Sequence, residues 1–205
     1  MRHCWARISC VVAGVLLGGL LMASSARALE PAAAEAVVRD AVADASAAFE
    51  GGPYGRDEKR ARVGRLVEKY ADIPYESEQL LGRHWRKASP EQRQTFVDLL
   101  IPFFVATYGE MIDGAKVKPE VTVVGSQAVA DGIVVLSVLK TPGEEAVKVN
   151  WTVATMTSGR TVITDLVAQD IGLVTTLKAD FTSVIRSAGG DIEALFAAMR
   201  KKIGA

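Results

Sequence analysis

The chain has 205 residues, of which 24 are basic, 24 are acidic and 49% are hydrophobic. This balanced charge argues against a nucleic-acid-binding protein, because contact with phosphates needs a strongly basic surface. The length suits one domain.

The first 28 residues have the pattern of an export signal. Two arginines precede an apolar run from Ile8 to Met22, and the small residues Ala26 and Ala28 suit a cleavage site. The run is shorter than the roughly 20 residues that cross a bilayer, and no later run approaches that length. We therefore expect residues 1–28 to be a cleaved signal peptide, and residues 29–205 to fold as one exported, soluble domain.

Both cysteines, Cys4 and Cys10, lie in this leader. Its removal also takes away three arginines and no acid, which leaves 21 basic against 24 acidic residues and a net charge of −3. The remaining chain has no thiol, so a disulfide is not available to it and the fold must rest on its hydrophobic core.

Residues 29–115 have helical patterns. The alanine-rich segment Pro31–Phe49 carries its valines on one face, and a pair of glycines and a proline end it. Asp57–Tyr70 places apolar residues at helical steps among charges, although Gly64 weakens that helix by about 1 kcal/mol relative to alanine. The dipeptide Ile73-Pro74 then predicts a break in the chain.

The clearest helix lies within Leu81–Tyr108. Ser89 is followed by Pro90 and by Gln92, so a hydroxyl cap, a favourable first residue and a reciprocal cap coincide. Apolar residues then recur at steps of three and four, at Phe96, Leu99, Leu100, Phe103, Phe104 and Thr107. Pro102 interrupts this pattern and removes a backbone hydrogen bond, so we expect a bend there.

The pattern of residues 117–168 predicts a sheet, because the spacing of apolar residues changes from a period of 3.6 residues to a period of 2. Short turns rich in glycine separate the strands and are typical of hairpins. The four predicted strands are Val121–Gly125, Ile133–Leu139, Val147–Met156 and Thr161–Val167. Residues 171–203 return to helical spacing in two segments that Gly189-Gly190 separates.

The predicted fold class is therefore α+β. Helices pack on a twisted four-stranded antiparallel sheet, and an apolar cavity lies between the two layers. Ordinary core is the default role for each large apolar residue. A cavity of roughly 300 to 1,000 Å³ is the alternative, and it would suit acyl chains, since each buried methylene contributes about 0.8 kcal/mol. We expect it to be lined by Phe96, Leu100, Phe103, Phe104, Tyr108, Val135, Val149, Trp151, Ile163, Leu173, Leu177 and Phe181.

Residues suited to catalysis are few. His84 is the only histidine after the leader, so no two-histidine metal site and no cysteine–histidine pair is predicted. Ser126 lacks the second glycine of a nucleophile elbow and is interpreted as a turn serine. Asp165 lies in a predicted strand and could act as a base in a cone-shaped pocket, with Tyr108 as hydrogen-bond donor. An enzyme of this kind, and an envelope adaptor with a filled core, are the alternatives to a lipid carrier.

Several short motifs occur in this order along the chain: Tyr75-Glu76, Leu81-Gly82, Trp85, Ser89–Arg93, Phe96, Thr107-Tyr108 and Asp165–Val167. With the leader, they resemble the periplasmic phospholipid-binding proteins of the MlaC, or toluene-tolerance auxiliary, family. Three positions depart from the family pattern, because Thr161 stands where tryptophan is expected, Asp170 where glycine is expected and Gly172 where serine is expected. These departures concern the subfamily, and the branch associated with hopanoid biosynthesis is one candidate.

The resemblance implies a lipid carrier and not an enzyme. Such a protein shuttles phospholipid, or a hopanoid-type lipid, through the periplasm between an inner-membrane transporter complex and an outer-membrane complex, which serves outer-membrane lipid asymmetry. It implies no metal, nucleotide or redox cofactor. Lipid tails would lie between sheet and helices, with the headgroup facing water.

Overall fold

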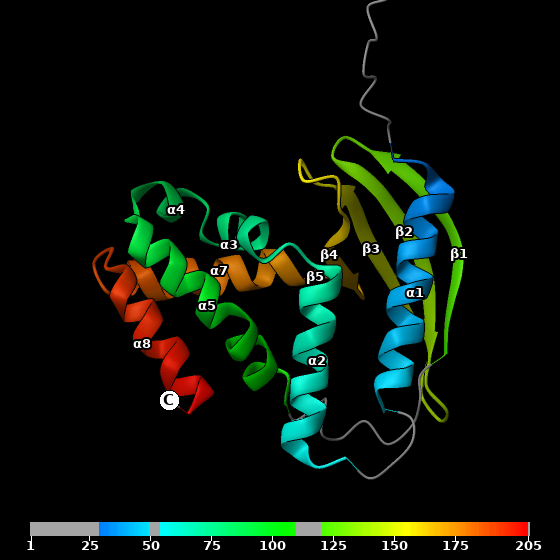
Figure 1. Cartoon of the computed structure of the whole chain (residues 1–205), viewed down its shortest axis with the longest axis horizontal. Helices are drawn as coiled ribbons and strands as arrows, with labels where there is room; N and C mark the ends of the chain where they lie inside the picture. The colour runs from blue at the N-terminus through cyan, green and yellow to red at the C-terminus, as the bar shows by residue number, and fades with distance from the viewer. Residues whose placement is uncertain (1–28, 50–53, 110–119, 205) are drawn as a thin grey trace, which may run out of the picture.

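The computed structural model describes residues 29–49, 54–109 and 120–204. The predicted signal peptide, residues 1–28, lies outside the described residues. Figure 1 shows two groups of elements: one helix rests on a sheet, other helices gather beside them, and a further helix, α2 (Arg56–Tyr70), stands between the groups. Within the described ranges, no helix is long and apolar enough to cross a membrane.

The described residues before the sheet form five helices. They are α1 (Pro31–Phe49), α2 (Arg56–Tyr70), α3 (Ile73–Leu81), α4 (Arg83–Lys87) and α5 (Pro90–Thr107). The predicted start of α5 is confirmed, because the Ser89 hydroxyl accepts from the Gln92 amide at 3.2 Å and Gln92 Oε1 accepts from the Ser89 amide at 3.0 Å. Helix α5 continues through Pro102, and the bend expected there stays a prediction.

The predicted break at Ile73-Pro74 is wrong, because these two residues open α3. Asp72 caps this helix, since its carboxylate accepts from the Tyr75 amide at 3.1 Å. Proline is tolerated in the first turn, where the backbone N–H groups have no partner within the helix. The same proline that would interrupt a helix in its middle therefore begins one here.

The sheet is a consecutive antiparallel meander in the order β1-β2-β3-β4-β5. Its strands are β1 (Glu120–Val129), β2 (Gly132–Lys140), β3 (Val147–Thr155), β4 (Thr161–Ala168) and β5 (Ile171–Gly172). The four predicted strands are confirmed, and the two-residue β5 adds a fifth. It forms because Gln169 and Asp170 both have positive φ, 50° and 63°, which turns the chain back so that Ile171 pairs with Ala168. Residues 117–119, where the sheet was expected to begin, lie outside the described residues.

Two helices follow the sheet, α7 (Leu173–Ser187) and α8 (Ile192–Ile203). The predicted stop at Gly189-Gly190 is confirmed, since both glycines have positive φ, 70° and 98°. Asp191 then caps α8 by accepting from the Glu193 amide at 2.9 Å.

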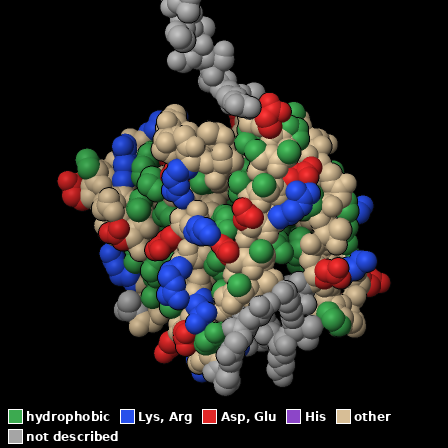
Figure 2. Space-filling view, turned by 45° about the vertical axis from the view of Figure 1, so that its right-hand side comes forward, with side chains coloured by type: hydrophobic (Ala, Val, Ile, Leu, Met, Phe, Trp, Pro, Cys, Tyr) green, Lys and Arg blue, Asp and Glu red, His purple; other side chains and the backbone are tan. Residues whose placement is uncertain are grey.

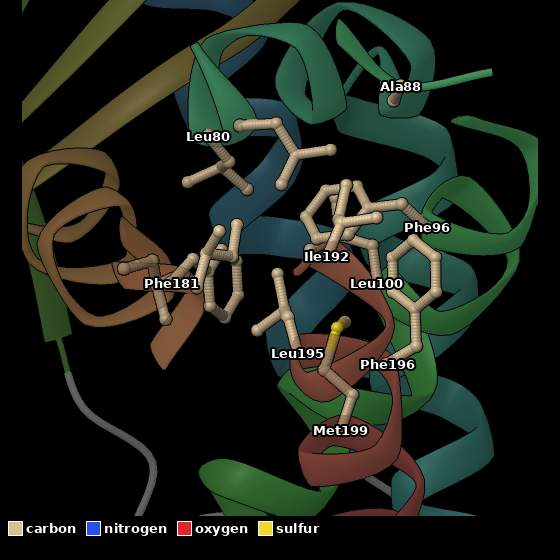
Figure 3. Close-up of a cluster of buried hydrophobic side chains, with 12 residues drawn as sticks. Leu80, Ala88, Phe96, Leu100, Phe181, Ile192, Leu195, Phe196 and Met199 are labelled. Carbon is tan, nitrogen blue, oxygen red and sulfur yellow. The ribbon is translucent and has the colours of Figure 1, made fainter. Parts of the chain in front are cut away.

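Buried apolar side chains form two cores. The helical core joins α3, α5, α7 and α8, and Figure 3 shows its side chains pointing toward one another from these helices. It consists of Leu80, Leu81, Ala88, Phe96, Leu100, Leu177, Phe181, Ile185, Ile192, Leu195, Phe196 and Met199. The sheet core lies between α1 and the sheet and consists of Ala34, Val38, Ile133, Val135 and Val153. Among the described residues, no side chain of α2 belongs to either core.

Candidate functional site

One face of the sheet carries a row of apolar side chains beneath α1. Val135 pairs with Trp151, and Val153 pairs with Ile163, so these four side chains project from the same face. Val149 shares this face, because it is two residues from Trp151 on the same strand. Val135 and Val149 are buried, at 0% and 4% exposure, whereas Trp151 and Ile163 are only half-buried.

A buried serine fixes the indole of Trp151. The Trp151 Nε1–H donates to the Ser137 hydroxyl at 2.9 Å, and that hydroxyl donates to the Val149 carbonyl at 2.8 Å. Ser137 is 2% exposed. The polar atoms on this apolar face are thus satisfied by one another, and the aromatic ring is held in one orientation.

Aromatic rings from α5 and α7 form a second apolar surface. Phe181 makes edge contacts with Phe96 and Phe103, with ring centroids 5.5 and 5.4 Å apart. Phe104 pairs with Tyr108 at 4.7 Å, and both rings are half-buried. Burial raises the pKa of Tyr108, and the charge of Asp180 adds to this effect.

The twelve predicted lining residues are divided between these regions. Phe96, Leu100, Leu177 and Phe181 belong to the helical core, with Phe103 and Leu173 packed against it. Val135 belongs to the sheet core, with Trp151 and Ile163 packed against it, while Val149 is buried nearby on the same strand face. Phe104 and Tyr108 belong to neither core among the described residues. The structure therefore places six of the twelve in buried positions and leaves the other six half-buried.

Two hollows lie at the surface of the described part of the chain. One, of about 500 Å³, is lined by Glu120, Lys140, Thr141, Pro142, Glu144 and Ala146, at the end of the sheet. The other, of about 250 Å³, lies between α1 and α2 and is lined by Val37, Asp40, Ala43, Asp44, Lys69, Tyr70 and Thr161. Neither is lined by the twelve residues, and the apolar cavity between sheet and helices stays a prediction.

Asp165, the acid considered as a catalytic base, has a structural role. One of its carboxylate oxygens accepts from the amides of Leu166 at 2.8 Å and Val174 at 3.2 Å, so it links β4 to the first turn of α7. Tyr108, its suggested partner, is instead influenced by Asp180. Asp165 lines neither of the two hollows. Ser126 lies in β1 and not in a turn, and its hydroxyl donates to Glu35 of α1 at 2.7 Å.

The sequence analysis did not single out the buried carboxyl of Glu76. This residue of α3 is 8% exposed, and its Oε1 atom has no hydrogen-bond partner among the described residues. Burial first, and then the charges of Asp165 and Asp72, raise its pKa to about 8. The available signal was its spacing, because Glu76 lies one helical turn before Leu80, on the buried face of α3.

Two observations on the described part of the chain bear on metal and nucleic-acid binding. In the ranges that the structure describes, no three histidine, cysteine, aspartate or glutamate side chains gather as a metal would require. On the face that Figure 2 shows, basic and acidic side chains are intermixed. Mixed charge of this kind lacks the single-signed field that phosphate binding uses.

Comparisons with known proteins agree with this fold. The family model described as MlaC protein matches residues 35–201. A solved structure of a phospholipid-binding protein from Ralstonia solanacearum, in complex with a phospholipid, is similar to this chain with a TM-score of 0.71 and 27% sequence identity. The alignment covers 83% of this chain and 97% of that one. No curated protein sequence matches. Since the family model spans most of the sequence, the chain belongs to the MlaC protein family.

Proposed function

We propose that this protein binds a phospholipid and carries it through the periplasm. The observation that carries the proposal is the similarity to the phospholipid complex from Ralstonia solanacearum, which extends over nearly all of that chain. Membership of the MlaC family supports the same function. The proposal includes export by residues 1–28 and delivery between an inner-membrane and an outer-membrane complex. A hopanoid-type lipid is an alternative cargo of the same apolar character.

The acyl chains would lie between the sheet face and the end of α5. Phe104 on α5, Tyr108 directly after it, and Trp151 and Ile163 on the sheet have half-buried side chains that a ligand could cover further. Each methylene buried there contributes about 0.8 kcal/mol, so two acyl chains bind well without any polar contact. The six buried residues of the predicted lining would form the wall behind these four, together with the half-buried Phe103 and Leu173.

Lipid extraction tests the proposal directly. The purified protein is extracted with organic solvent and the extract analysed by mass spectrometry, and the protein is then incubated with phosphatidylethanolamine and phosphatidylglycerol vesicles. We expect co-purified or captured phospholipid in molar proportion to the protein. A protein that yields no lipid and takes none from the vesicles would contradict the proposal.

A matched pair of substitutions tests the location. Phe104→Asp should lower lipid occupancy because it places a charge on the half-buried surface, while the far-UV circular dichroism spectrum stays that of the parent. Val124→Asp is the control, since Val124 is 62% exposed on the sheet. Equal losses of lipid and of helical signal in Phe104→Asp would show that Phe104 is ordinary core.

A further inference from the structure

Helix α2 is packed differently from the other long helices. Of its described residues only Gly64 is buried, and none of its side chains belongs to the helical core or the sheet core. Val63, Leu66 and Val67 share one side of the helix by their spacing and are half-buried. Figure 1 shows α2 standing between α1, which rests on the sheet, and α5 in the helical group. The helix therefore bridges the two groups without being anchored by the core of either.

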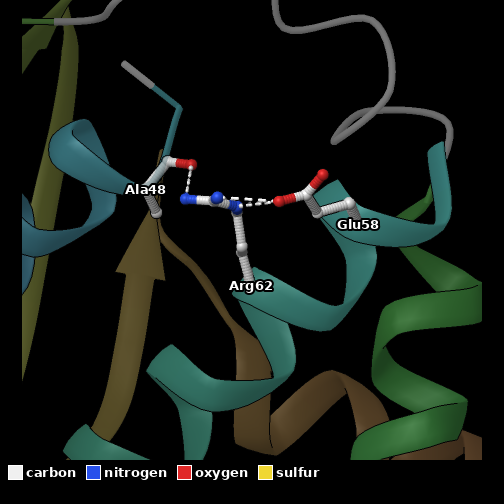
Figure 4. A network of polar contacts seen from close by, with 3 residues as sticks. All are labelled: Ala48, Glu58 and Arg62. Carbon is white, nitrogen blue, oxygen red and sulfur yellow. Dashed lines mark hydrogen bonds and ion pairs between the residues drawn. The ribbon is translucent and has the colours of Figure 1, made fainter. Parts of the chain in front are cut away.

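Polar contacts hold α2 against α1. The Arg62 guanidinium donates to the Ala48 carbonyl at 3.1 Å and to Glu58 at 2.7 Å, as Figure 4 shows, and it lies over the Tyr54 ring at 3.8 Å. Near the other end of α2, the Asp44 carboxylate accepts from the Tyr70 hydroxyl at 2.6 Å and pairs with Lys69.

The ion pair between Lys69 and Asp44 is the weakest of these contacts. The side chains of Lys69 and Asp44 are 61% and 40% exposed, so water screens their attraction and competes for the same hydrogen bonds. The hollow of about 250 Å³ lies along the same seam and reaches Val37 and Thr161, so side chains do not fill the space between the two helices. Helices α1 and α2 can consequently separate at a low cost in free energy.

The C-terminal end of α2 is held from the sheet by one arginine. The Arg160 guanidinium, in the turn between β3 and β4, donates to the carbonyls of Glu68, Lys69 and Ala71 at 3.4, 3.1 and 3.3 Å. These are the carbonyls that a helix end leaves without partners. One exposed side chain thus attaches the C-terminal end of α2 to the turn between β3 and β4.

The crossing of α2 with α5 is close. A Cβ atom added at Gly64 would lie 3.5 Å from the Cγ2 atom of Ile101, so the helix backbone approaches α5 at this glycine, and Arg60 of α2 lies against Gly109, just after α5. Gly64, the one α2 residue of the described chain that is buried, brings no side chain to this crossing, so it contributes less apolar burial than a core residue would.

We propose that α2 is a movable helix that closes the entrance to the lipid site. It moves away from α1 and α5 to let acyl chains pass. The inference rests on the proposed function. When α2 is closed, its half-buried apolar side faces inward and covers the chains; when it is open, the polar contacts of Asp44 and Arg160 are replaced by water. Motions of this kind gate ligand exchange in many proteins on the microsecond to millisecond scale.

A reversible disulfide across the crossing tests the gate. A Cβ atom at position 64 lies 3.5 Å from Cγ2 of Ile101, which is bonded to the Cβ atom of that residue. The two Cβ atoms are therefore roughly 4 to 5 Å apart, near the range that disulfides span, and Gly64→Cys with Ile101→Cys brings two thiols within reach of a bond. Cys4→Ser and Cys10→Ser remove the two native thiols of the full chain. Transfer of pyrene-labelled phosphatidylethanolamine between donor and acceptor vesicles is then measured for the oxidised and the reduced protein.

We expect the oxidised protein to transfer lipid at least about tenfold more slowly than the same protein reduced, because every passage would need the locked crossing to open. Each single-cysteine variant, treated with the same oxidant, is the control and should transfer at the parent rate. Equal rates for the oxidised and reduced double variant would overturn the proposal.

A second variant weakens the attachment of α2 instead of locking the helix in place. Arg160→Ala removes the attachment of α2 to the sheet and should raise the transfer rate several-fold. Arg39→Ala is the matched control, because Arg39 pairs with Glu35 within α1 and has no such contact to α2. An unchanged rate in Arg160→Ala, with an unchanged circular dichroism spectrum, would count against the role of α2.

Thiol labelling separates failure of the gate from failure of the lipid function. Gly64 is buried at the crossing, so a cysteine at this position becomes accessible to a thiol reagent when α2 moves away from α5. If no form of the protein takes up lipid, the proposed function fails, and labelling of Gly64→Cys still decides whether α2 moves. We expect it to be labelled at least about tenfold faster in the folded protein than Leu100→Cys in the helical core. Equal labelling rates would show that α2 is fixed in place.

Discussion

Glu76→Gln should remove most of the pH dependence of folding stability between pH 4.5 and pH 8. The carboxyl is 8% exposed, and burial, followed by the charges of Asp165 and Asp72, raises its pKa from 4.5 to about 8. The unfolded chain ionises this group at its ordinary pKa, so across the interval the folded protein binds a proton that unfolding releases. The contribution of Glu76 to the free energy of unfolding is therefore highest below pH 4.5, falls as the pH rises, and levels off above the folded pKa.

The size of the effect follows from the width of this interval. Each pH unit is worth about 1.36 kcal/mol, so the stability contributed by keeping Glu76 neutral falls by about 5 kcal/mol between pH 4.5 and pH 8. That is a large share of the roughly 5 to 15 kcal/mol that hold a typical domain folded. Glutamine has a similar shape and no charge at either pH, so the variant should be more stable than the parent at the upper limit and nearly equal to it at the lower one.

Urea unfolding followed by far-UV circular dichroism, at both pH limits, measures this difference. Other titrating groups, including His84, are common to both proteins, so the difference between parent and variant isolates Glu76. Glu78→Gln is the matched control, because Glu78 is exposed on the same helix. Parallel stability curves for the parent and Glu76→Gln would refute the reasoning.

Three further substitutions test packing and backbone geometry. Gly64→Ala should raise the melting temperature by a few degrees, since alanine favours the helix by about 1 kcal/mol relative to glycine. The added Cβ atom would lie at an ordinary contact distance of 3.5 Å from Ile101. A lower melting temperature would show that the crossing of α2 with α5 cannot accept a methyl group. Ser137→Ala should lower the free energy of unfolding by about 1 to 3 kcal/mol, because it leaves the Trp151 N–H without its partner, and a shifted tryptophan fluorescence maximum should accompany the loss. Asp170→Gly should stabilise the hairpin by about 0.5 kcal/mol, since φ is 63° at this position; urea unfolding that shows destabilisation would contradict this account.

The elements with a local chemical cause could be predicted from the sequence. The cap at Ser89, the stop at Gly189-Gly190 and the four long strands follow from side chains acting on their own backbone. The strand β5 could not, because it depends on two residues, Gln169 and Asp170, that adopt positive φ although neither is glycine. Pro74 was misinterpreted because a proline interrupts a helix when it lies in the interior but is favourable when it lies in the first turn, as it does in α3.

The site was harder to predict than the fold. Helical spacing identified Phe96 and Phe104 as apolar positions of one helix, but period alone does not say that Phe96 enters a packed core while Phe104 stays half-buried. That distinction depends on where α8 packs, and α8 lies about a hundred positions further along the chain. Glu76 was missed for a related reason, since a carboxyl reads as solvated until its neighbours in space are known.

The pairing of α5 with α8 also has a consequence for the order in which the protein is assembled. Gln92 donates to Glu193 at 2.9 Å across 101 positions of sequence, and the rings of Phe96 and Phe196 lie 6.5 Å apart. The sheet needs only neighbouring hairpins and can form from contacts that are local in the chain. The helical core, by contrast, stays incomplete until the final helix has been synthesised, and the phenylalanines of α5 are not fully packed before then. A chain cut short before Ile192 would therefore expose Phe96 and be prone to aggregation, although every residue of its sheet would be present.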